Sequence, residues 1–221
     1  MGTVLITGAN RGLGLEMAKQ YSNNGWDVMA TARAPEKAEE LNAIGNVQVM
    51  ALDAADETSI AQFAAEIGDQ PIDLFINNAG IYGPMDLDRS GWLDLFAVNV
   101  VAPVQLATAL KDNVARSKDK KMMVLSSQVG SIAENDTGSM MYYRSSKAAV
   151  NQAWKSLALQ WKDDGLTLAM LHPDWVKTDM GGPQAPLSPQ ESVSGMRQVI
   201  DGLNHDQTGT FHNYDGQSIP W

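Results

Sequence analysis

Short apolar runs alternate with stretches of helical periodicity along the whole chain of 221 residues, and this alternation limits the fold more than any other feature. Seven runs have the length and composition of strands: residues 3–7, 27–32, 47–52, 73–77, 122–126, 167–171 and 209–213. Most are apolar at successive positions, as expected of a parallel sheet that helices cover on both faces. Strand and helix in repeated alternation, without a linker or a repeat, predict a single doubly wound α/β domain over residues 1–221.

The expected helices carry start and stop signals. Apolar residues recur at helical spacing between the strands, and a glycine such as Gly68 follows the run. Ser188 and Glu191 form a capping box with Pro189 at the first helical position, which predicts a helix up to about Leu203.

Charge and histidine spacing exclude several kinds of partner and site. Sixteen basic and 26 acidic residues give a net charge of −10, the opposite sign to a protein that binds nucleic acid or an anionic membrane. The absence of cysteine excludes disulfides, thiolate nucleophiles and cysteine-based metal sites. His172, His205 and His212 lack the spacing of metal ligands, so we expect no metal site.

The segments that could direct a protein to a membrane or out of the cell are weak in this chain. The first residues run into the first strand without the charged and apolar regions of a secretory signal. The most apolar long stretch, residues 96–110, contains Asn99, Pro103 and Gln105 and is too short to span a bilayer. We therefore expect a soluble, cytoplasmic protein.

A glycine-rich turn follows the first expected strand, at the spacing G-x-x-x-G-x-G. Its residues are Gly8, Asn10, Arg11, Gly12, Leu13 and Gly14, with Ala9 after the first glycine. Glycines permit a tight turn, let the backbone approach a pyrophosphate, and allow the helix to pack close to the sheet. The helix N-terminus then presents free N–H groups to the phosphates. The turn predicts a dinucleotide site, and the alternative is an ordinary turn between a strand and a helix.

Charge at the end of the second strand indicates which dinucleotide would bind. NAD sites usually place an acidic residue about 20 residues beyond the glycines, on the ribose hydroxyl. This strand ends at Arg33 without an acid, and Arg11 lies in the turn itself. Two guanidinium groups suit a 2′-phosphate, so NADP(H) is favoured over NAD(H). The alternative is that Arg33 is a solvated loop residue, neutralised by Glu36, Glu39 or Glu40.

A tyrosine and a lysine lie one helical turn apart, at Tyr143 and Lys147. Residues at this spacing share a helix face. A nearby ammonium favours a phenolate, so we expect the pKa of Tyr143 to fall below its ordinary value of about 10, which would suit a general acid or base. Tyr142 would point about 100° away. Such a pair also arises by chance on helix surfaces.

Two polar residues could complete the site. Ser127 follows the fifth strand, at the sheet edge where ligands bind, and could hold a carbonyl; its rival Ser126 should face elsewhere. Asn99 precedes Pro103 by four residues, so its carbonyl lacks the usual helical donor. We expect the helix to bend there, with a water linking Asn99 to Lys147.

Together these residues resemble the short-chain dehydrogenase/reductase family. The matching motifs occur in the family's order: Thr7-Gly8-x-x-x-Gly12-x-Gly14, Asn77-Asn78-Ala79-Gly80, Asn99, Ser127 and Tyr143-x-x-x-Lys147. Arg11 and the segments 175–182 and 214–221 resemble the C-factor-like branch, near the sniffer-type carbonyl reductases. The resemblance implies a seven-stranded Rossmann sheet and hydride transfer between a nicotinamide and a carbonyl or alcohol.

The resemblance also implies a role for each matching residue. Tyr143 would be the acid or base, and Lys147 would lower its pKa and bind the nicotinamide ribose. Ser127 would orient the carbonyl and Asn99 would hold the relay water. Outside the glycine turn, further residues would contact the cofactor: Arg33, Asp53, Asn78, Ala79, Gly80, Pro173, Val176 and Thr178.

Two features depart from the family's pattern. The family commonly has Pro-Gly after the sixth strand, whereas Asp174 follows Pro173 here and brings a carboxylate near the ring. The substrate loop, at about residues 181–195, is short, which predicts an open and unselective site. The candidates for its pocket are apolar and rich in sulfur: Tyr82, Val129, Met140, Met141 and Trp175. For the two methionines, core packing is the alternative.

Other functions are also compatible with the sequence. The chain could be a signalling or regulatory protein that binds NAD(P) with little or no turnover, or a structural homodimer with vestigial chemistry. A long helix expected at about residues 139–161 carries the small residues Ala148, Ala149 and Ala153 on a second face, which could pack on a partner copy. We expect a homodimer, with a tetramer as the alternative, and a small-molecule substrate.

Overall fold

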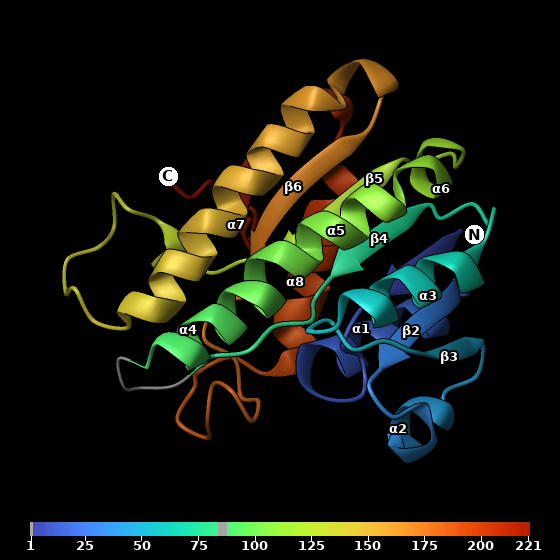
Figure 1. The fold of residues 1–221 in the computed structure, drawn as a ribbon, viewed down its shortest axis with the longest axis horizontal. Helices are drawn as coiled ribbons and strands as arrows, with labels where there is room; N and C mark the ends of the chain where they lie inside the picture. The colour runs from blue at the N-terminus through green and yellow to red at the C-terminus, as the bar shows by residue number, and fades with distance from the viewer. Residues whose placement is uncertain (1, 84–87) are drawn as a thin grey trace.

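A parallel sheet forms the middle layer of the computed structural model, which describes residues 2–83 and 88–221 (Figure 1). Within these residues the sheet has seven strands: β1 (Thr3–Ile6), β2 (Asp27–Ala32), β3 (Val47–Ala51), β4 (Leu74–Asn77), β5 (Lys121–Leu125), β6 (Thr167–His172) and β7 (Thr210–Asn213). Their order is β3-β2-β1-β4-β5-β6-β7, and every neighbouring pair is parallel. The predicted seven-stranded, doubly wound α/β fold is confirmed, and each strand end lies within about one residue of the predicted one.

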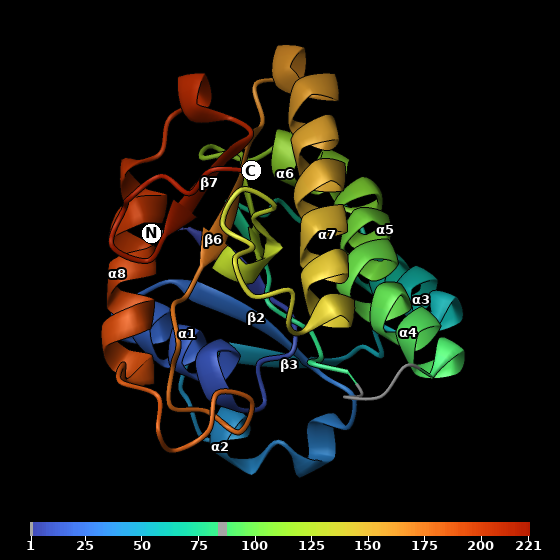
Figure 2. The same cartoon turned by 90° about the vertical axis from the view of Figure 1, so that its left-hand side faces the viewer.

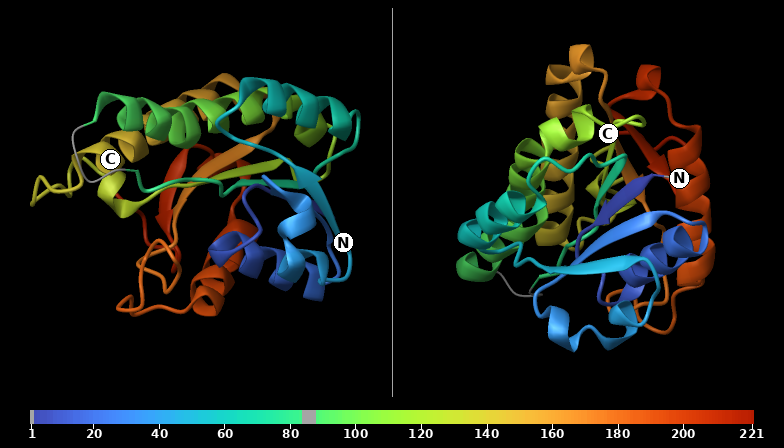
Figure 3. Two further views of the ribbon diagram at one scale, coloured as in Figure 1. Left: turned by 60° about the horizontal axis from the view of Figure 1, so that its bottom comes forward. Right: turned by 90° about the vertical axis from the view of Figure 1, so that its right-hand side faces the viewer.

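Helices cover both faces of the sheet (Figures 2 and 3). One face carries α1 (Gly12–Asn23), α2 (Glu39–Asn42) and α8 (Pro189–Gly202). The other carries α3 (Glu57–Ile67), α4 (Arg89–Phe96), α5 (Ala102–Ala109) and α7 (Met141–Gln160), and the short α6 (Lys111–Ala115) follows α5. The predicted capping box is present at α8. Of the predicted substrate loop over residues 181–195, only residues 181–188 precede the helix.

Each central strand divides its side chains between two hydrophobic cores. On β5, Met122 and Val124 face the core under α3, α5 and α7, whereas Met123 and Leu125 face the core under α1 and α8. Both sets are buried. Burial on both faces explains why the strand pattern is apolar at successive positions rather than at alternate ones.

The chain changes direction across the sheet at β1. This strand pairs with β2 on one side and with β4 on the other, so the connections that follow β1 and β4 diverge. In open α/β sheets a crevice forms outside the carboxyl ends of the strands at such a point. The loops after β1, β2 and β4 therefore meet where a ligand could bind.

The predicted disruption of the helix at Asn99 takes the form of a π-helical turn. Residues Ala97–Val101 adopt it between α4 and α5, and the N–H of Ala102 donates to the carbonyl of Ala97. The resulting helical run, Arg89–Ala109, is longer than the sequence indicated, and its length and hydropathy match those of a membrane-spanning helix. Its middle holds the buried, polar Asn99. The run packs against α3 and α7.

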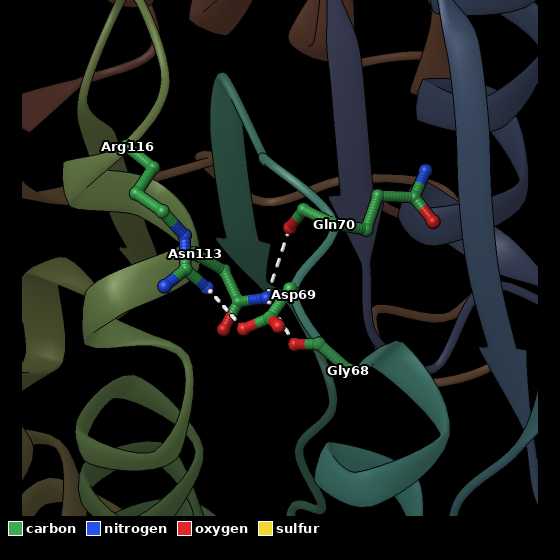
Figure 4. Close-up of polar contacts among 5 residues, drawn as sticks. All are labelled: Gly68, Asp69, Gln70, Asn113 and Arg116. Carbon is green, nitrogen blue, oxygen red and sulfur yellow. Dashed lines mark hydrogen bonds and ion pairs between the residues drawn. The ribbon is translucent and has the colours of Figure 1, made fainter.

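Polar contacts fasten the amino end of the sheet, away from that crevice (Figure 4). The side-chain Nδ2 of Asn113, on α6, donates to the carbonyls of Gly68 (2.8 Å) and Gln70 (2.9 Å) in the connection between α3 and β4. Beside it, Arg116 pairs with Asp69 at 3.2 Å. Gly68 ends α3, as predicted, with a positive φ of 58°, a conformation that favours glycine.

Candidate active site

A cavity of about 600 Å³ lies along the carboxyl ends of β1 to β6. Most of the predicted site residues line it: Gly8, Asn10, Arg11, Gly12, Leu13, Arg33, Asp53, Asn78, Ala79, Gly80, Tyr143, Lys147, Pro173 and Thr178. The structure thus joins the glycine turn and the Tyr143–Lys147 pair in one wall. Four of the residues predicted for catalysis or cofactor binding do not line this cavity: Gly14, Asn99, Ser127 and Val176.

The glycines of the turn are each required by the backbone or by a close neighbour. Gly8 and Gly12 have positive φ values of 63° and 58°, which other residues rarely adopt. A Cβ on Gly14 would lie 2.6 Å from both the carbonyl oxygen of Gly8 and Nδ2 of Asn78. Gly14 therefore acts behind the cavity wall, where it lets α1 approach the strand ends.

Hydrogen bonds brace the turn against the loop after β4. Thr7 Oγ1 accepts from the backbone N–H groups of Asn78 (3.1 Å) and Ala79 (3.0 Å). Asn78 Nδ2 in return donates to the carbonyls of Thr7 (2.8 Å) and Gly8 (3.0 Å). The first turn of α1 has no side chain that caps it, so its backbone N–H groups are available to an anion.

Two arginines line the cavity: Arg33, at the end of β2, and Arg11, in the glycine turn. Arg33 is exposed on the cavity wall and makes no ion pair within the described residues, whereas Glu40 pairs with Lys19 at 3.2 Å. Arg11 pairs at 3.1 Å with Asp179, which belongs to the segment after β6, and both side chains are exposed. A solvent-exposed pair of this kind is weak, so a phosphate can compete with Asp179 for Arg11.

Tyr143 and Lys147 lie on the face of α7 that meets the end of β5. Nζ of Lys147 is 5.6 Å from the centre of the Tyr143 ring and donates to the carbonyl of Leu125 at 2.8 Å. A Cβ on Gly130 would lie 2.8 Å from Cβ of Lys147, so this glycine permits the close approach of α7. Tyr142 is buried against Trp92, away from this pair, as predicted.

Burial dominates the ionisation of this pair. Desolvation raises the pKa of Tyr143 well above its ordinary value, and the neighbouring Tyr82 phenol adds to the rise. Desolvation lowers the pKa of Lys147 to about 8. The predicted fall in the pKa of the phenol is therefore wrong for the chain by itself, because burial disfavours the charged phenolate.

Asn99 fixes the loop that carries Tyr82. Its Oδ1 accepts from the N–H of Ile81 (2.9 Å), and its Nδ2 donates to the carbonyl of Ile81 (2.8 Å) and to Oγ of Ser146 (3.2 Å). A Cβ on Gly80 would lie 3.3 Å from Oδ1 of Asn99 and 3.8 Å from Nζ of Lys147. Asn99 and Lys147 thus both approach Gly80 from the side that a Cβ would occupy, although only Lys147 lines the cavity.

The two serines after β5 have different partners. Ser126 Oγ donates to Oδ1 of Asn151 at 2.5 Å, which turns this hydroxyl away from Tyr143 and into the layer under α7. Ser127 is buried, and its Oγ accepts from the N–H of Val129 at 3.4 Å. The Ser126 hydroxyl therefore has a partner away from Tyr143, as expected, but it is Ser126 and not Ser127 that lines the cavity.

None of the residues predicted for the substrate pocket lines the cavity described above. The ring of Tyr82 lies 5.0 Å from that of Tyr143. Met140 and Met141 are 37% and 47% exposed, so these methionines are not core residues. Trp175 is 53% exposed, and its Nε1 donates to the carbonyl of Gly181 at 2.7 Å.

In the segment after β6, Asp174 and Val176 differ from what the sequence predicts for the cavity wall. Asp174, at the position where the family commonly has glycine, adopts a positive φ of 69°, and its carboxylate accepts from the N–H of Trp175 at 2.6 Å. Val176 is buried, and it forms a bridge with Leu187 instead of lining the cavity; Thr178 does line it.

Sequence reasoning missed several residues of the wall. Thr31 binds the glycine turn twice: its Oγ1 accepts from the N–H of Gly8 (3.2 Å) and its carbonyl from the N–H of Ala9 (2.8 Å). The remaining wall residues that were missed are Ala32, Leu52, Ala54, Ala55, Ile81, Asp94, Val98, Leu125, Ser126, Asp179 and Met180. Many of them follow strand ends, so their position relative to the predicted strands was the available signal.

Comparisons with known proteins agree with this arrangement. The sequence profile of the family described as short chain dehydrogenase matches residues 2–187. The protein named C-signal from Myxococcus xanthus is 37% identical over 163 residues, which cover 72% of this chain and 98% of that protein. The structure of the carbonyl reductase Sniffer of D. melanogaster has a TM-score of 0.92 and 34% identity and covers 100% of both chains. The NADPH-bound carbonyl reductase from chicken fatty liver has a TM-score of 0.92 and 30% identity, covering 100% of this chain and 99% of that one.

Proposed function

Because the chain belongs to the short-chain dehydrogenase/reductase family, in the branch of the C-factor-like and sniffer-type carbonyl reductases, we propose that it reduces a small-molecule carbonyl with NADPH. Members of this family are oxidoreductases, and the chain is one of them. The observation that carries the proposal is the single cavity that joins the glycine turn to Tyr143 and Lys147.

The residues present fit a dinucleotide. The positive φ of Gly8 and Gly12 and the uncapped N-terminus of α1 form a cradle for a pyrophosphate, next to a cavity of about 600 Å³. Asp53 lies at the end expected for the adenine, and Asn78, Ala79 and Gly80 line the middle. Pro173 and Thr178 line the opposite side. When bound, the dinucleotide supplies the hydride.

Two arginines support a preference for NADP(H) over NAD(H). Arg33 is exposed at the carboxyl end of β2 and is free of an ion pair among the described residues. Arg11 can exchange its exposed partner Asp179 for a phosphate. The NADPH that is bound to the chicken liver carbonyl reductase is consistent with this choice.

Tyr143 is the residue that would donate the proton. The raised pKa keeps its phenol protonated at neutral pH, which suits an acid in carbonyl reduction better than a base in alcohol oxidation. Lys147, with a pKa of about 8, is mostly cationic at pH 7 and stabilises the charge that forms when the proton leaves. Ser127 would orient the carbonyl and Asn99 would hold the relay water.

The apolar side chains predicted for the substrate pocket indicate the substrate class. Tyr82, Met140, Met141 and Trp175 offer aromatic and sulfur-rich surface with substantial exposure. We infer an open pocket for aromatic or aliphatic carbonyls, bounded on one side by the loop over residues 181–188.

The test is NADPH consumption across a panel of aromatic and aliphatic aldehydes, ketones and quinones, with Tyr143→Phe as the matched variant. The proposal predicts turnover by the wild type and a loss of at least about 100-fold in the variant, within the usual size of an acid-base contribution. Equal rates for the two proteins across the panel would contradict it.

A second candidate function is signalling with little or no turnover. The similarity to a protein named C-signal favours it. A protein that only binds the dinucleotide needs no proton donor, so Tyr143→Phe would leave its signalling output unchanged. The same variant therefore separates the two functions.

We propose that the protein is cytoplasmic and has no nucleic-acid or membrane partner, in line with its net charge of −10. We also propose a homodimer, with a tetramer as the alternative, formed through the small residues Ala148, Ala149 and Ala153 of α7. Light scattering of the purified chain measures this state.

A further inference from the structure

A layer of polar side chains lies between α7 and the carboxyl end of the sheet, behind the cavity wall. We call Ser126, Asn151, His172 and Asn213 the polar layer. His172 on β6 is in register with Asn213 on β7, and Leu125 pairs with Leu171, so Ser126 continues the row beside His172. Met122, Val124, Met170 and Phe211, two or four residues earlier on these strands, face the core under α7. Because side chains alternate along a strand, the polar residues face α7 as well.

Several atoms of the polar layer are buried without a hydrogen-bond partner among the described residues. Asn151 accepts from Ser126 through Oδ1, but its Nδ2 is unpaired. His172, which is 9% exposed, has an unpaired Nδ1, and Asn213 has an unpaired Oδ1. Buried polar atoms in folded proteins are nearly always paired, so three unpaired ones in one layer require an explanation.

The unpaired atoms have complementary hydrogen-bonding roles. Nδ2 of Asn151 is a donor, Oδ1 of Asn213 is an acceptor, and Nδ1 of a neutral imidazole is an acceptor when the proton is on Nε2. The geometry points to a site for one buried water molecule in the polar layer, which accepts from Asn151 and donates to His172 and Asn213. Three hydrogen bonds are typical of a buried water.

The charge state of His172 agrees with this site. Burial lowers its pKa to about 4, and Lys147 adds to the fall, while the carboxylates of Asp174 and Glu134 oppose it. The imidazole is therefore neutral at neutral pH, as an accepting Nδ1 requires. Protonation would convert that acceptor into a donor.

The site has a consequence for the catalytic helix, and this part rests on the proposed function. Asn151 follows Lys147 by one helical turn on the same face of α7. Lys147 contacts the carbonyl of Leu125, and Asn151 contacts the hydroxyl of Ser126, so consecutive turns of α7 bind the last residue of β5 and the residue that follows it. A water on Nδ2 of Asn151 holds its Oδ1 toward Ser126. His172 is thus a positioning residue for the turn that carries Lys147.

A crystal structure of the full chain that shows ordered waters tests the site directly. We expect density within about 2.7–3.2 Å of Asn151 Nδ2, His172 Nδ1 and Asn213 Oδ1. A dry layer, or a direct hydrogen bond between Asn151 and His172, would overturn the inference. This measurement needs no turnover, so it stands apart from the proposed function.

Two matched variants test the positioning role. His172→Asn keeps a polar atom near the place of Nδ1, whereas His172→Gln moves it toward the place of Nε2. We expect the Gln variant to lose the water, shift the pH profile of turnover and lower kcat by about two- to tenfold, the effect of one hydrogen bond, with the KM for NADPH unchanged. The Asn variant should retain the water and most of the kcat.

The outcomes separate the two proposals. Equal kcat values and pH profiles for both variants would refute the positioning role. A wild type that contains the water but reduces no carbonyl would refute the proposed function and leave the water site standing. In that case the structure of the Gln variant tests the positioning role. If the water holds this turn of α7, the distance from Lys147 Nζ to the Leu125 carbonyl lengthens beyond 2.8 Å when the water is lost; if the distance is unchanged, the positioning role is refuted.

Discussion

At the scale of single residues, the site places a neutral phenol and a partly destabilised ammonium side by side. Burial raises the pKa of Tyr143 and lowers that of Lys147 to about 8. Both shifts favour the uncharged form, so the fold bears a cost to keep Lys147 cationic at pH 7. Such a cost is common at sites where a charge is needed for chemistry.

Replacing Lys147 by Met should therefore stabilise the chain while it abolishes turnover. The pKa of Lys147 is about 8 in the fold against an ordinary 10.5, and each unit corresponds to about 1.4 kcal/mol, so the buried cation costs about 3 kcal/mol below pH 8. Part of the gain is offset by the lost bond to Leu125, which leaves about 1–3 kcal/mol.

The stability gained by the Lys147→Met replacement should decrease as the pH rises. Between pH 8 and 10.5 the unfolded chain binds more protons than the fold, so the wild type gains stability as the pH rises and the advantage of Lys147→Met shrinks. Urea unfolding at pH 7 and pH 10 measures both values. A Lys147→Met variant that is less stable than the wild type at pH 7 would refute the assignment.

Arg33 should decide which dinucleotide the chain prefers. Arg33→Ala removes a charge-assisted hydrogen bond to a 2′-phosphate, worth about 1.5–3 kcal/mol, and should raise the KM for NADPH by about ten- to a hundredfold. The KM for NADH should change little. Steady-state kinetics with both cofactors checks this, and an equal loss for NADPH and NADH would show that Arg33 does not contact the phosphate.

At the scale of elements, close approach between a helix and a strand end determines the shape of the site. α1 reaches the end of β1 because Gly14 has no side chain, and α7 reaches the turn after β5 because Gly130 has none. The loop after β4 is held by Thr7 on one side and by Asn99 on the other. The side chains proposed for catalysis are thus positioned by the packing of these elements.

Gly14→Ala tests the approach of α1. The new Cβ would lie 2.6 Å from the Gly8 carbonyl, so α1 must shift, and we expect a loss of NADPH affinity of at least tenfold together with lower stability. Gly202→Ala is the matched control, because its Cβ meets nothing within 4 Å, so it should leave the NADPH affinity unchanged. NADPH titration and thermal unfolding measure both; unchanged affinity in Gly14→Ala would rule out this role.

The contacts at the opposite end of the sheet should affect stability alone. Asn113→Ala leaves the carbonyls of Gly68 and Gln70 without their donor and should lower the free energy of unfolding by about 1–3 kcal/mol (Figure 4). Arg116→Ala, beside it, removes only an exposed ion pair and should cost less than about 1 kcal/mol. Urea unfolding compares the two, and kcat should stay the same in both; equal losses of stability would contradict the account.

At the scale of the whole molecule, one sheet brings together residues that are far apart in the sequence. The glycine turn after β1, the loop after β4 and the start of α7 meet at the carboxyl edge, where the direction of the chain across the sheet reverses. The helices on either face bury the strands and leave this edge as the place where a ligand binds. The function of the chain follows from that convergence.

Strands, helices and the glycine turn could be predicted because their signals are local. The apolar runs located all seven strands of the described chain, and the spacing of Gly8, Gly12 and Gly14 identified the turn. The pKa of Tyr143 could not be predicted, because its burial depends on Tyr82 and on packing far from it in the sequence. The pairing of Arg11 with Asp179, 168 residues apart, likewise carried no local signal.

In the proposed reaction, Tyr143 delivers the proton while hydride passes from a bound NADPH to a carbonyl carbon. The most direct test uses NADPH that carries deuterium at C4 of its nicotinamide and follows the deuterium into the product. We predict that the wild type places the label on the carbon of the product alcohol, whereas Tyr143→Phe binds NADPH with a similar Kd and transfers at least about 100-fold less. Label transfer at equal rates in both proteins, or a wild type that binds NADPH and transfers none to any carbonyl, would contradict the account.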